Sequence, residues 1–434
     1  MSRIGTLRWS GQPDDQQSGS RSSLHGFLPA LARLLLILGL VSSLFWVPLF
    51  ESGGLGTVTV ADFCLLCLWP ITLIYLLASL RLSRANLHPF WIAVLATIIG
   101  LLSAVAAYSF TGSPVSAVSD LALHMKRFGL ASIIPLALWT FGSRRFTGTS
   151  VIVIAVSLVL ISVFSIFPQF QRLLPAYQSS ATSLEGDVRA TGAVSNPNDL
   201  AYVSVLALCS IYGLAVNVRK SVFSNIVVGI ASLSGLANIV LSGSRSGVLS
   251  LLAAASFIVV RSRMTKSKKL ILLASVLVAG FVGFQLSDIF ASRIQRAYNE
   301  RLGDASISIR LQMQAVAAEV SLRHPIGVGM RNFVAATKGE LGDVPFTQIS
   351  GSDSIYFDTL VATGFAGLLV LVALYRLIWL YQSTCPPRPR VYFSGGFVAA
   401  LVFGCASVSP SSVYVAPLFF FTVGAAGLYS FNRD

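Results

Sequence analysis

The chain has 434 residues, of which 54% are hydrophobic and only 11% are charged, and its formal net charge is +14. Ordinary soluble domains contain about 25% charged residues, so this composition excludes a soluble globular protein and indicates an integral membrane protein. The positive charge does not indicate a nucleic-acid partner, because the basic residues stand in short clusters between apolar runs.

The chain begins with a polar segment and then follows a regular series of apolar runs. Residues 1–26 predict a disordered cytoplasmic tail. The first apolar run lacks a small-residue cleavage site, so we expect a retained helix rather than a signal peptide. A helix needs about 20 apolar residues to cross the hydrocarbon core, which predicts about twelve spans. Their ranges are Phe27–Phe50, Val58–Leu80, Pro89–Ser109, Leu121–Phe141, Ser150–Phe167, Leu200–Val216, Val222–Leu241, Gly247–Val260, Leu270–Phe290, Ser354–Leu380, Val391–Val408 and Ser411–Tyr429.

The predicted fold is therefore an all-α integral membrane protein with a large periplasmic loop that contains short helices. Residues 27–290 hold about nine of the spans, residues 291–353 form the loop, and residues 354–434 hold the last spans and a short cytoplasmic C-terminus. Lysines and arginines concentrate in alternate loops, whereas the short loops Glu51–Thr57 and Phe110–Asp120 contain none. By the positive-inside rule, both termini are expected in the cytoplasm.

The large outer loop is unusually basic. It carries Arg293, Arg296, Arg301, Arg310, Arg323, Arg331 and Lys338, and an anionic ligand is the simplest reason for such charge on the outer side. Asp304–Leu322 reads as a helix whose apolar line includes Met313 and Val316. Arg310 stands one residue off that line, so it is free to bind a ligand or to form a salt bridge with Glu319 or Asp304.

Two other outer segments contain candidate ligand-binding arginines. Arg189 precedes an Asn-Pro-Asn turn, where Asn198 or Asp199 is expected to cap the following helix. Arg245 lies in the tight connection Ser242–Gly247, whose backbone N–H groups are suited to an anion nest. The alternative role for Arg245 is anchoring to lipid head groups.

Several charges fall inside or beside the predicted spans. Lys126 and Arg127 lie near the outer end of the fourth span, and Asp62 lies in the second. Charges in hydrocarbon usually pair or line a polar cavity, so either a helix-joining pair with Asp62 or a ligand role is open. Asp353 and Asp358 begin the tenth span, where Asp353 suits a helix N-cap or a catalytic base. The five cysteines, including Cys64 and Cys67, predict no metal site and no disulfide framework.

Four stretches resemble the family of O-antigen ligases and O-antigen polymerases, which are multi-pass glycosyltransferases of the bacterial inner membrane. The stretches are Arg189 with Gly192 and Asn196-Pro197-Asn198; Gly243-Ser244-Arg245-Ser246-Gly247; Arg310 with His324-Pro325, Gly327-Val328-Gly329 and Phe333; and Ser352-Asp353-Ser354-Ile355-Tyr356 with Gly364-Phe365-Ala366-Gly367-Leu368. The resemblance covers roughly residues 189–380, with the stretches in the family's order around a large outer loop.

The resemblance implies metal-independent transfer of an oligosaccharide from undecaprenyl diphosphate to an acceptor hydroxyl at the periplasmic face, without a cofactor. Arg189 and Arg310 then become the diphosphate clamp, supported by Arg245, and Asp353 becomes the base or acceptor-orienting group. Asp358 is its substitute. Further substrate contacts are expected from Arg323, Arg331, Lys126 and Arg127.

One departure from the family bears on the reaction. Ligases that transfer glycan to lipid A–core carry a histidine where this chain has Asp353. The resemblance therefore favours a polysaccharide polymerase, closer to the exopolysaccharide polymerases, with a ligase as the alternative. A lipid-linked oligosaccharide flippase is the alternative from another class, although the charge lies at one face rather than across the midplane. Expected partners are the undecaprenyl-diphosphate-linked oligosaccharide, the membrane, a chain-length regulator and export machinery.

Overall fold

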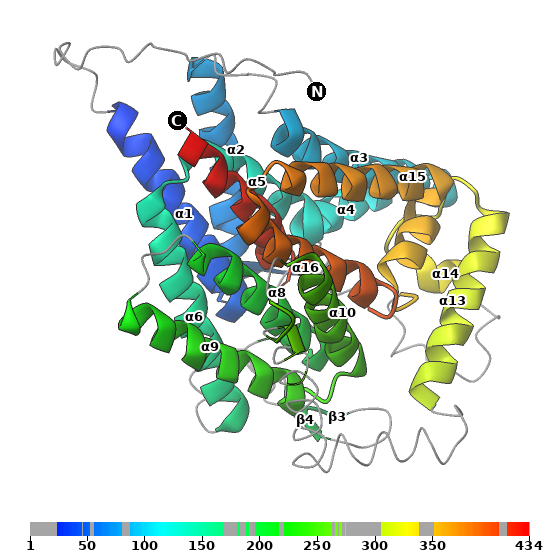
Figure 1. Ribbon diagram of the computed structural model, residues 1–434. Coiled ribbons are helices and arrows are strands. Elements are labelled where there is room, and N and C mark those ends of the chain that lie inside the picture. Colours follow the sequence, from blue (N-terminus) through cyan, green and yellow to red (C-terminus); the bar gives the residue numbers. More distant parts are fainter. Residues whose placement is uncertain are drawn as a thin grey trace, which may run out of the picture.

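The computed structural model describes most of the predicted helices (Figure 1). The residues it describes are 24–45, 47–52, 56–79, 87–167, 180–182, 188–190, 194, 196–216, 221–262, 265–267, 269–270, 274, 305–337, 351–407 and 415–433. Residues 1–23 of the predicted tail lie outside the described residues, whereas residues 24–26 already belong to a helix. Nearly all of the span Leu270–Phe290, and Arg293, Arg296, Arg301 and Lys338, also lie outside them.

The described part of the chain is predominantly helical. Its N-terminal half contains α1 (Leu24–Phe45), α2 (Val60–Ser79), α3 (Leu87–Thr111), α4 (Pro114–His124), α5 (Ile134–Phe141), α6 (Arg144–Ile166) and α8 (Pro197–Ala215). It continues with α9 (Val222–Leu241), α10 (Arg245–Arg261), α13 (Ala305–Arg323), α14 (Phe333–Ala336), α15 (Ile355–Ser383), α16 (Pro387–Gly404), α17 (Ala416–Gly424) and the 3-10 helix η6 (Ala425–Arg433). The helical periodicity of the sequence therefore located these elements to within a few residues in most cases.

Eight helical segments of the described residues are long and apolar enough to cross a membrane. They expose large apolar side chains on their outer faces, such as Leu66 on α2, Leu233 on α9 and Leu369 on α15. Apolar faces of this extent suit a lipid environment, where they need no further cover. The chain is thus an all-α multi-pass membrane protein, while the span count of about twelve and the orientation of the termini remain predictions.

The bundle is built around α8, which packs against α6, α9, α10, α16 and α17. Its side chains are buried almost all round, and Tyr202 stacks on Phe403 of α16 at a ring distance of 4.5 Å. In Figure 1, α6 and α9 lie on one side of this centre, while α13 and α14 lie at the opposite edge. A helix that is apolar on every face is expected at the centre of such a bundle.

Three local features differ from the expected all-helical spans. Two short antiparallel hairpins are present, β1 (Pro48–Ser52) with β2 (Gly56–Thr59), and β3 (Ser180–Thr182) with β4 (Val188–Ala190). The fourth span begins at Pro114, because Ser113 caps α4, so most of the predicted outer loop Phe110–Asp120 is helix. The same span contains a π-helical turn, η2 (Met125–Gly129), followed by a 3-10 turn, η3 (Leu130–Ile133).

Two charged side chains, Asp62 and Arg33, form hydrogen bonds at helix ends. The Asp62 carboxylate accepts hydrogen bonds from the N–H and the hydroxyl of Thr59, both at 2.9 Å, and Thr59 Oγ1 in turn accepts from the Asp62 N–H. This reciprocal capping box explains why a carboxylate begins α2. Arg33 Nε donates to the carbonyl of Phe141 at 2.7 Å, at the carboxyl end of α5, where a cation is stabilised by the helix dipole.

The tenth predicted span, α15, is broken at Gly364, which has φ 66° and ψ −167°. At the break, Val328 and Gly329 donate their N–H groups to the carbonyls of Val361 and Ala362 at 2.9 and 3.0 Å. Phe365 N–H donates to the carbonyl of Pro325 at 3.2 Å. The turn that follows α13 is therefore hydrogen-bonded into the gap, so that the groups released from α15 find backbone partners.

Replacing Gly364 with alanine is expected to lower the thermal unfolding midpoint strongly. The positive φ alone costs about 1–3 kcal/mol for a residue with a Cβ, and that Cβ would also collide with the Pro325 carbonyl. Gly112→Ala is the matched control, since Gly112 has φ +67° but no atom within 4 Å of an added Cβ. An equal decrease in the thermal unfolding midpoint of the two purified variants would show that the turn docked against Gly364 contributes nothing to stability.

Candidate active site

The structure brings Arg310 and Asp353 together. Arg310 Nε on α13 lies 3.2 Å from Asp353 Oδ2, and Arg310 Nη1 donates to the carbonyl of Ala406, just after α16, at 3.2 Å. The two side chains are 28% and 43% exposed, so a ligand can still reach both charges. Of the two partners proposed from the sequence, Glu319 is not the one used, because Arg310 pairs across the fold with Asp353, and Asp304 lies outside the described residues.

Asp353 does not cap α15, which corrects one of the two roles expected for it. Ser354 occupies the N-cap position, and Asp353 has φ 56°, a left-handed backbone conformation found at no other non-glycine residue in the described part of the chain. Such a conformation is unfavourable for most residues with a Cβ and needs support from its neighbours. Its presence at a charged residue singles out Asp353 as a functional candidate.

The residues on either side of Asp353 supply that support. Asp358 Oδ1 accepts hydrogen bonds from both the N–H and the hydroxyl of Ser352 at 2.6 Å. Ser354 Oγ donates to the carbonyl of Gly404 at 3.1 Å. The backbone is thus fixed on both sides, and the Asp353 carboxylate is directed toward Arg310. Asp358 positions this segment rather than acting only as a substitute base.

Asp120 is a site-forming residue that the sequence reasoning missed. Its side chain is fully buried, and its carboxylate accepts from the N–H groups of Met330 and Arg331 at 2.9 Å each and from the Ser103 hydroxyl. It therefore ties the turn after α13 to α3 and α4. The available signal was weak, because a lone carboxylate at the end of a predicted loop looks like a solvated charge.

Asp120→Ala is expected to loosen the turn at residues 327–333. Three donors lose their buried acceptor, and each unsatisfied buried group costs about 1–3 kcal/mol. Amide hydrogen exchange of this peptide should therefore accelerate. Ser103→Ala removes one donor and leaves both backbone N–H groups paired, so its effect should be much smaller. Unchanged exchange in Asp120→Ala would contradict the role assigned to this carboxylate.

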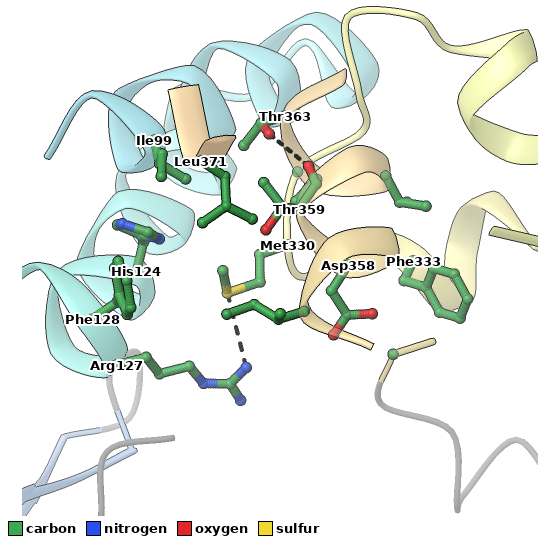
Figure 2. A pocket seen from close by; sticks show the side chains of 15 residues that line it. Ile99, His124, Arg127, Phe128, Met330, Phe333, Asp358, Thr359, Thr363 and Leu371 are labelled. Atoms are coloured by element: carbon green, nitrogen blue, oxygen red, sulfur yellow. Dashed lines mark hydrogen bonds between the residues drawn. The ribbon is translucent and has the colours of Figure 1, made fainter. Parts of the chain in front are cut away.

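A pocket opens beside Asp353, between η2, α15 and the turn after α13 (Figure 2). Its lining includes Arg127, Met330, Gly351, Ile355 and Asp358. Arg127 and Asp358 extend into the same space from opposite walls, and Arg127 Nη1 contacts Met330 Sδ at 3.8 Å. The extra residue of the π-helical turn shifts the side chains that follow it, and such turns are frequent at functional sites.

The remaining predicted site residues lie elsewhere. Arg245 is the first residue of α10, whose cap Ser244 donates through its hydroxyl to Asn198 Oδ1 at 3.0 Å, so the starts of α8 and α10 meet. Asn196, not Asn198 or Asp199, caps α8, which corrects that expectation. The backbone of Arg189 lies in β4. Arg323 pairs with exposed Glu319 on its own helix at 3.9 Å, and Lys126 lies in η2.

Arg331 contributes to the site through its backbone N–H, which Asp120 holds, while its side chain is exposed. The structure thus pairs Arg310 with Asp353, and it places Arg127 and Asp358 in the lining of one pocket. Among the described residues, no group of three or more His, Cys, Asp or Glu side chains is placed to hold a metal ion.

Part of the chain is similar to a known protein family. Residues 230–372 match the family model of the O-antigen ligases. The matched segment contains Arg245, Arg310, Asp353 and Asp358, whereas Asp120 and Arg127 precede it. No curated protein matches the chain significantly.

Proposed function

We propose that this chain, whose residues 230–372 match the family model of the O-antigen ligases, is a polysaccharide polymerase. It elongates a glycan carried on undecaprenyl diphosphate at the periplasmic face of the bacterial inner membrane. The observation that carries the proposal is the Arg310–Asp353 pair at 3.2 Å, with Asp353 held in a left-handed conformation.

The chemistry follows from the two charges. The acceptor hydroxyl attacks the anomeric carbon of the donor glycan, and Asp353 takes the hydroxyl proton. The bond between that carbon and the diphosphate oxygen breaks, and undecaprenyl diphosphate departs with the electron pair. The planar guanidinium of Arg310 stabilises the departing anion through forked hydrogen bonds, as arginine does with phosphates. Arg189 and Arg245 are the further donors that we propose for the diphosphate.

The Arg310–Asp353 pair also suggests how the reaction begins. While Arg310 binds Asp353, the guanidinium Nε occupies Oδ2 of the carboxylate. A diphosphate that attracts Arg310 breaks this contact and leaves Oδ2 open to the acceptor hydroxyl. Arrival of the donor thereby prepares the base.

A ligase is the second candidate, because the matching family model is described as O-antigen ligase. The carboxylate at position 353, where ligases of the family carry a histidine, is the reason to place the polymerase first. A flippase is the alternative function that is not catalytic, and it would form no new glycosidic bond.

The test is a reaction with purified protein in lipid nanodiscs and undecaprenyl-diphosphate repeat units, with and without a chelator. A ladder of longer glycans that persists with the chelator supports the polymerase. Transfer to lipid A–core without a ladder would assign the ligase, and movement of the lipid-linked glycan without transfer would assign the flippase. Arg145→Gln, an exposed arginine at the start of α6, is the control for loss of positive charge.

A further inference from the structure

Helix α13 carries apolar residues on two opposite sides. Its inner side belongs to the small apolar core beside α15 and contains Met313, Val316, Ala317 and Val320. The opposite side carries a second apolar set, which we call the outer stripe: Leu311, Ala315, Ala318 and Leu322. Leu311 and Leu322 are 62% and 73% exposed. A helix in water needs only one apolar side, the one that faces the core, so the outer stripe requires a second apolar environment.

Polar side chains separate the two apolar sides of α13. On one margin, Arg310 and Gln314 donate to the carbonyls that follow α16, both at 3.2 Å. The other margin is exposed and contains Gln312, Glu319 and Arg323. An apolar line between polar margins suits a helix that lies in a membrane surface, with its margins among the headgroups.

Contacts near both ends of α13 fix how it lies. Toward its start, Gln314 bonds to the carbonyl of Cys405 just after α16. Just beyond its end, the His324 ring packs edge to face on Phe110 near the end of α3, with 5.4 Å between the ring centres. In the topology predicted from the sequence, α3 and α16 both end on the outer side. A helix of 19 residues, about 28 Å long, that is held at both places runs along the outer edge of the bundle (Figure 1).

The exposed apolar surface continues from α13 onto a membrane-spanning helix. Ile326, four residues beyond Leu322, is 62% exposed. Its neighbour Pro325 accepts a hydrogen bond from the N–H of Phe365 on α15 at 3.2 Å. Phe365 and Leu369 are exposed apolar side chains of this span, and such side chains face lipid in a membrane protein. The outer stripe therefore adjoins a lipid-facing surface, and the same lipid can cover both.

We propose that the outer stripe binds the phospholipids of the outer leaflet, so that α13 lies in the membrane interface. Interfacial helices bury their apolar side about 5–10 Å into the boundary between headgroups and acyl chains. Leu311 and Leu322 then lie among acyl chains, and Arg323 on the exposed margin lies at the level of the lipid phosphates. This inference goes beyond the proposed function, because binding of phospholipid by the stripe requires no glycan and no catalysis.

The depth of α13 also sets the depth of Arg310. Arg310 precedes Leu311, and its guanidinium is held between Asp353 and the Ala406 carbonyl. With Leu311 in the acyl region, this guanidinium lies near the headgroup phosphates. The diphosphate of a lipid-linked donor lies at the same level, so it can reach Arg310 without leaving the bilayer surface. This consequence, unlike the lipid binding itself, rests on the proposed function.

The first test compares two exposed positions on the same helix. Leu322→Cys places a thiol in the outer stripe, and Glu319→Cys places one on the exposed margin. In nanodiscs of phosphatidylethanolamine and phosphatidylglycerol, a charged maleimide should modify Glu319→Cys at least about tenfold faster, because a thiolate and a charged reagent are both disfavoured in lipid. Mass spectrometry of the α13 peptide measures each rate without interference from the native cysteines. Equal rates would overturn the proposal.

A photoreactive benzoylphenylalanine in place of Leu322 identifies what covers the stripe. In nanodiscs that hold one protein molecule and only the two phospholipids, irradiation should attach phospholipid, which intact-mass measurement detects. The same photoreactive residue in place of Leu369 on α15 is the positive control. In place of Glu319, it should give at least about fivefold less phospholipid adduct.

Other occupants give other products, and each of them would overturn the proposal. A bond from position 322 to another part of the same chain would show that protein covers the stripe. A covalent dimer in nanodiscs that hold two copies, with no phospholipid adduct, would identify a second copy of this chain. A polyprenyl adduct that replaces the phospholipid adduct when undecaprenyl diphosphate is added would assign the stripe to the carrier chain of the donor.

A double substitution tests the consequence for Arg310. Leu311→Ser together with Leu322→Ser changes only exposed side chains, so the unfolding midpoint should change little. KM for the lipid-linked donor should rise by about fivefold or more, whereas inhibition by inorganic diphosphate, which is soluble, should change by less than about twofold. An unchanged donor KM would overturn the consequence for Arg310. If the wild type forms no glycosidic bond, the proposed function fails, and labelling and cross-linking still decide whether α13 binds lipid.

Discussion

Replacing Arg310 with alanine is expected to reduce kcat for glycan transfer by about 10²- to 10³-fold, the usual effect of removing one donor that stabilises a developing anion. In the proposed reaction the positively charged guanidinium binds the departing diphosphate, and in the structure its Nε lies 3.2 Å from Asp353 Oδ2. Arg310→Lys keeps the charge and loses the forked geometry, so its activity should fall between alanine and wild type. Initial rates at saturating donor and acceptor measure the effect.

Gln314→Ala is the matched control for this variant. Gln314 lies one turn further along α13 and donates to the carbonyl of Cys405 at 3.2 Å, next to the Ala406 carbonyl that Arg310 contacts. It thus shares the docking of α13 onto the end of α16 but carries no charge. If Gln314→Ala lost as much activity as Arg310→Ala, the arginine would act through docking and not through the diphosphate.

Asp353→Asn is expected to reduce kcat by about 10²- to 10⁴-fold, the range for loss of a general base. Asparagine tolerates positive φ well, so the backbone at φ 56° should persist and the unfolding midpoint should change little. The substitution therefore separates chemistry from folding. Rates at saturating substrate, together with the unfolding midpoint, give the two readouts.

Two comparison variants make the Asp353 result specific. Glu319→Gln removes an exposed carboxylate that pairs with Arg323 on the surface of α13, and it should leave the rate unchanged. Asp353→Gly removes both the carboxylate and the strain, so it should be as inactive as Asp353→Asn but no less stable locally. Full activity of the Asp353→Asn variant would exclude Asp353 as the general base and leave Asp358 as the candidate.

The helices were predictable because their signal is local. A span such as Val222–Leu241 has the same limits in the sequence prediction and in the structure, since its apolar run and its capping Ser221 lie side by side in the chain. The apolar line on α13 was also predicted, and it packs with Val328, Phe333 and Val361. Such patterns do not predict deviations from α-helical geometry inside a span. The π-helical turn that begins at Met125 is an example, because it needs no particular residue type.

The site was only partly predictable, because its geometry depends on distant partners. The sequence pointed to Arg310 and Asp353 separately, but their pairing requires α13 and the start of α15 to meet. The role of Asp120 could not be predicted, because its carboxylate accepts hydrogen bonds from two backbone N–H groups that lie far away in the sequence. Gly364 belongs to one of the stretches that resemble the family. Its role in breaking α15, so that the turn with Pro325 and Val328 can hydrogen-bond to the helix backbone, is visible only in the folded structure.

The Asp120 contact also constrains the order in which this protein can be built. Asp120 and Met330 are separated by 210 residues, which a ribosome needs roughly 10–40 s to add. During that time the Asp120 carboxylate lacks its two backbone donors and keeps only the Ser103 hydroxyl on α3. The contact between α4 and the turn at Gly329 can therefore form only after residue 331 has been added. A chain arrested before residue 330 is expected to be more sensitive to proteolysis at α3 and α4 than the full-length protein.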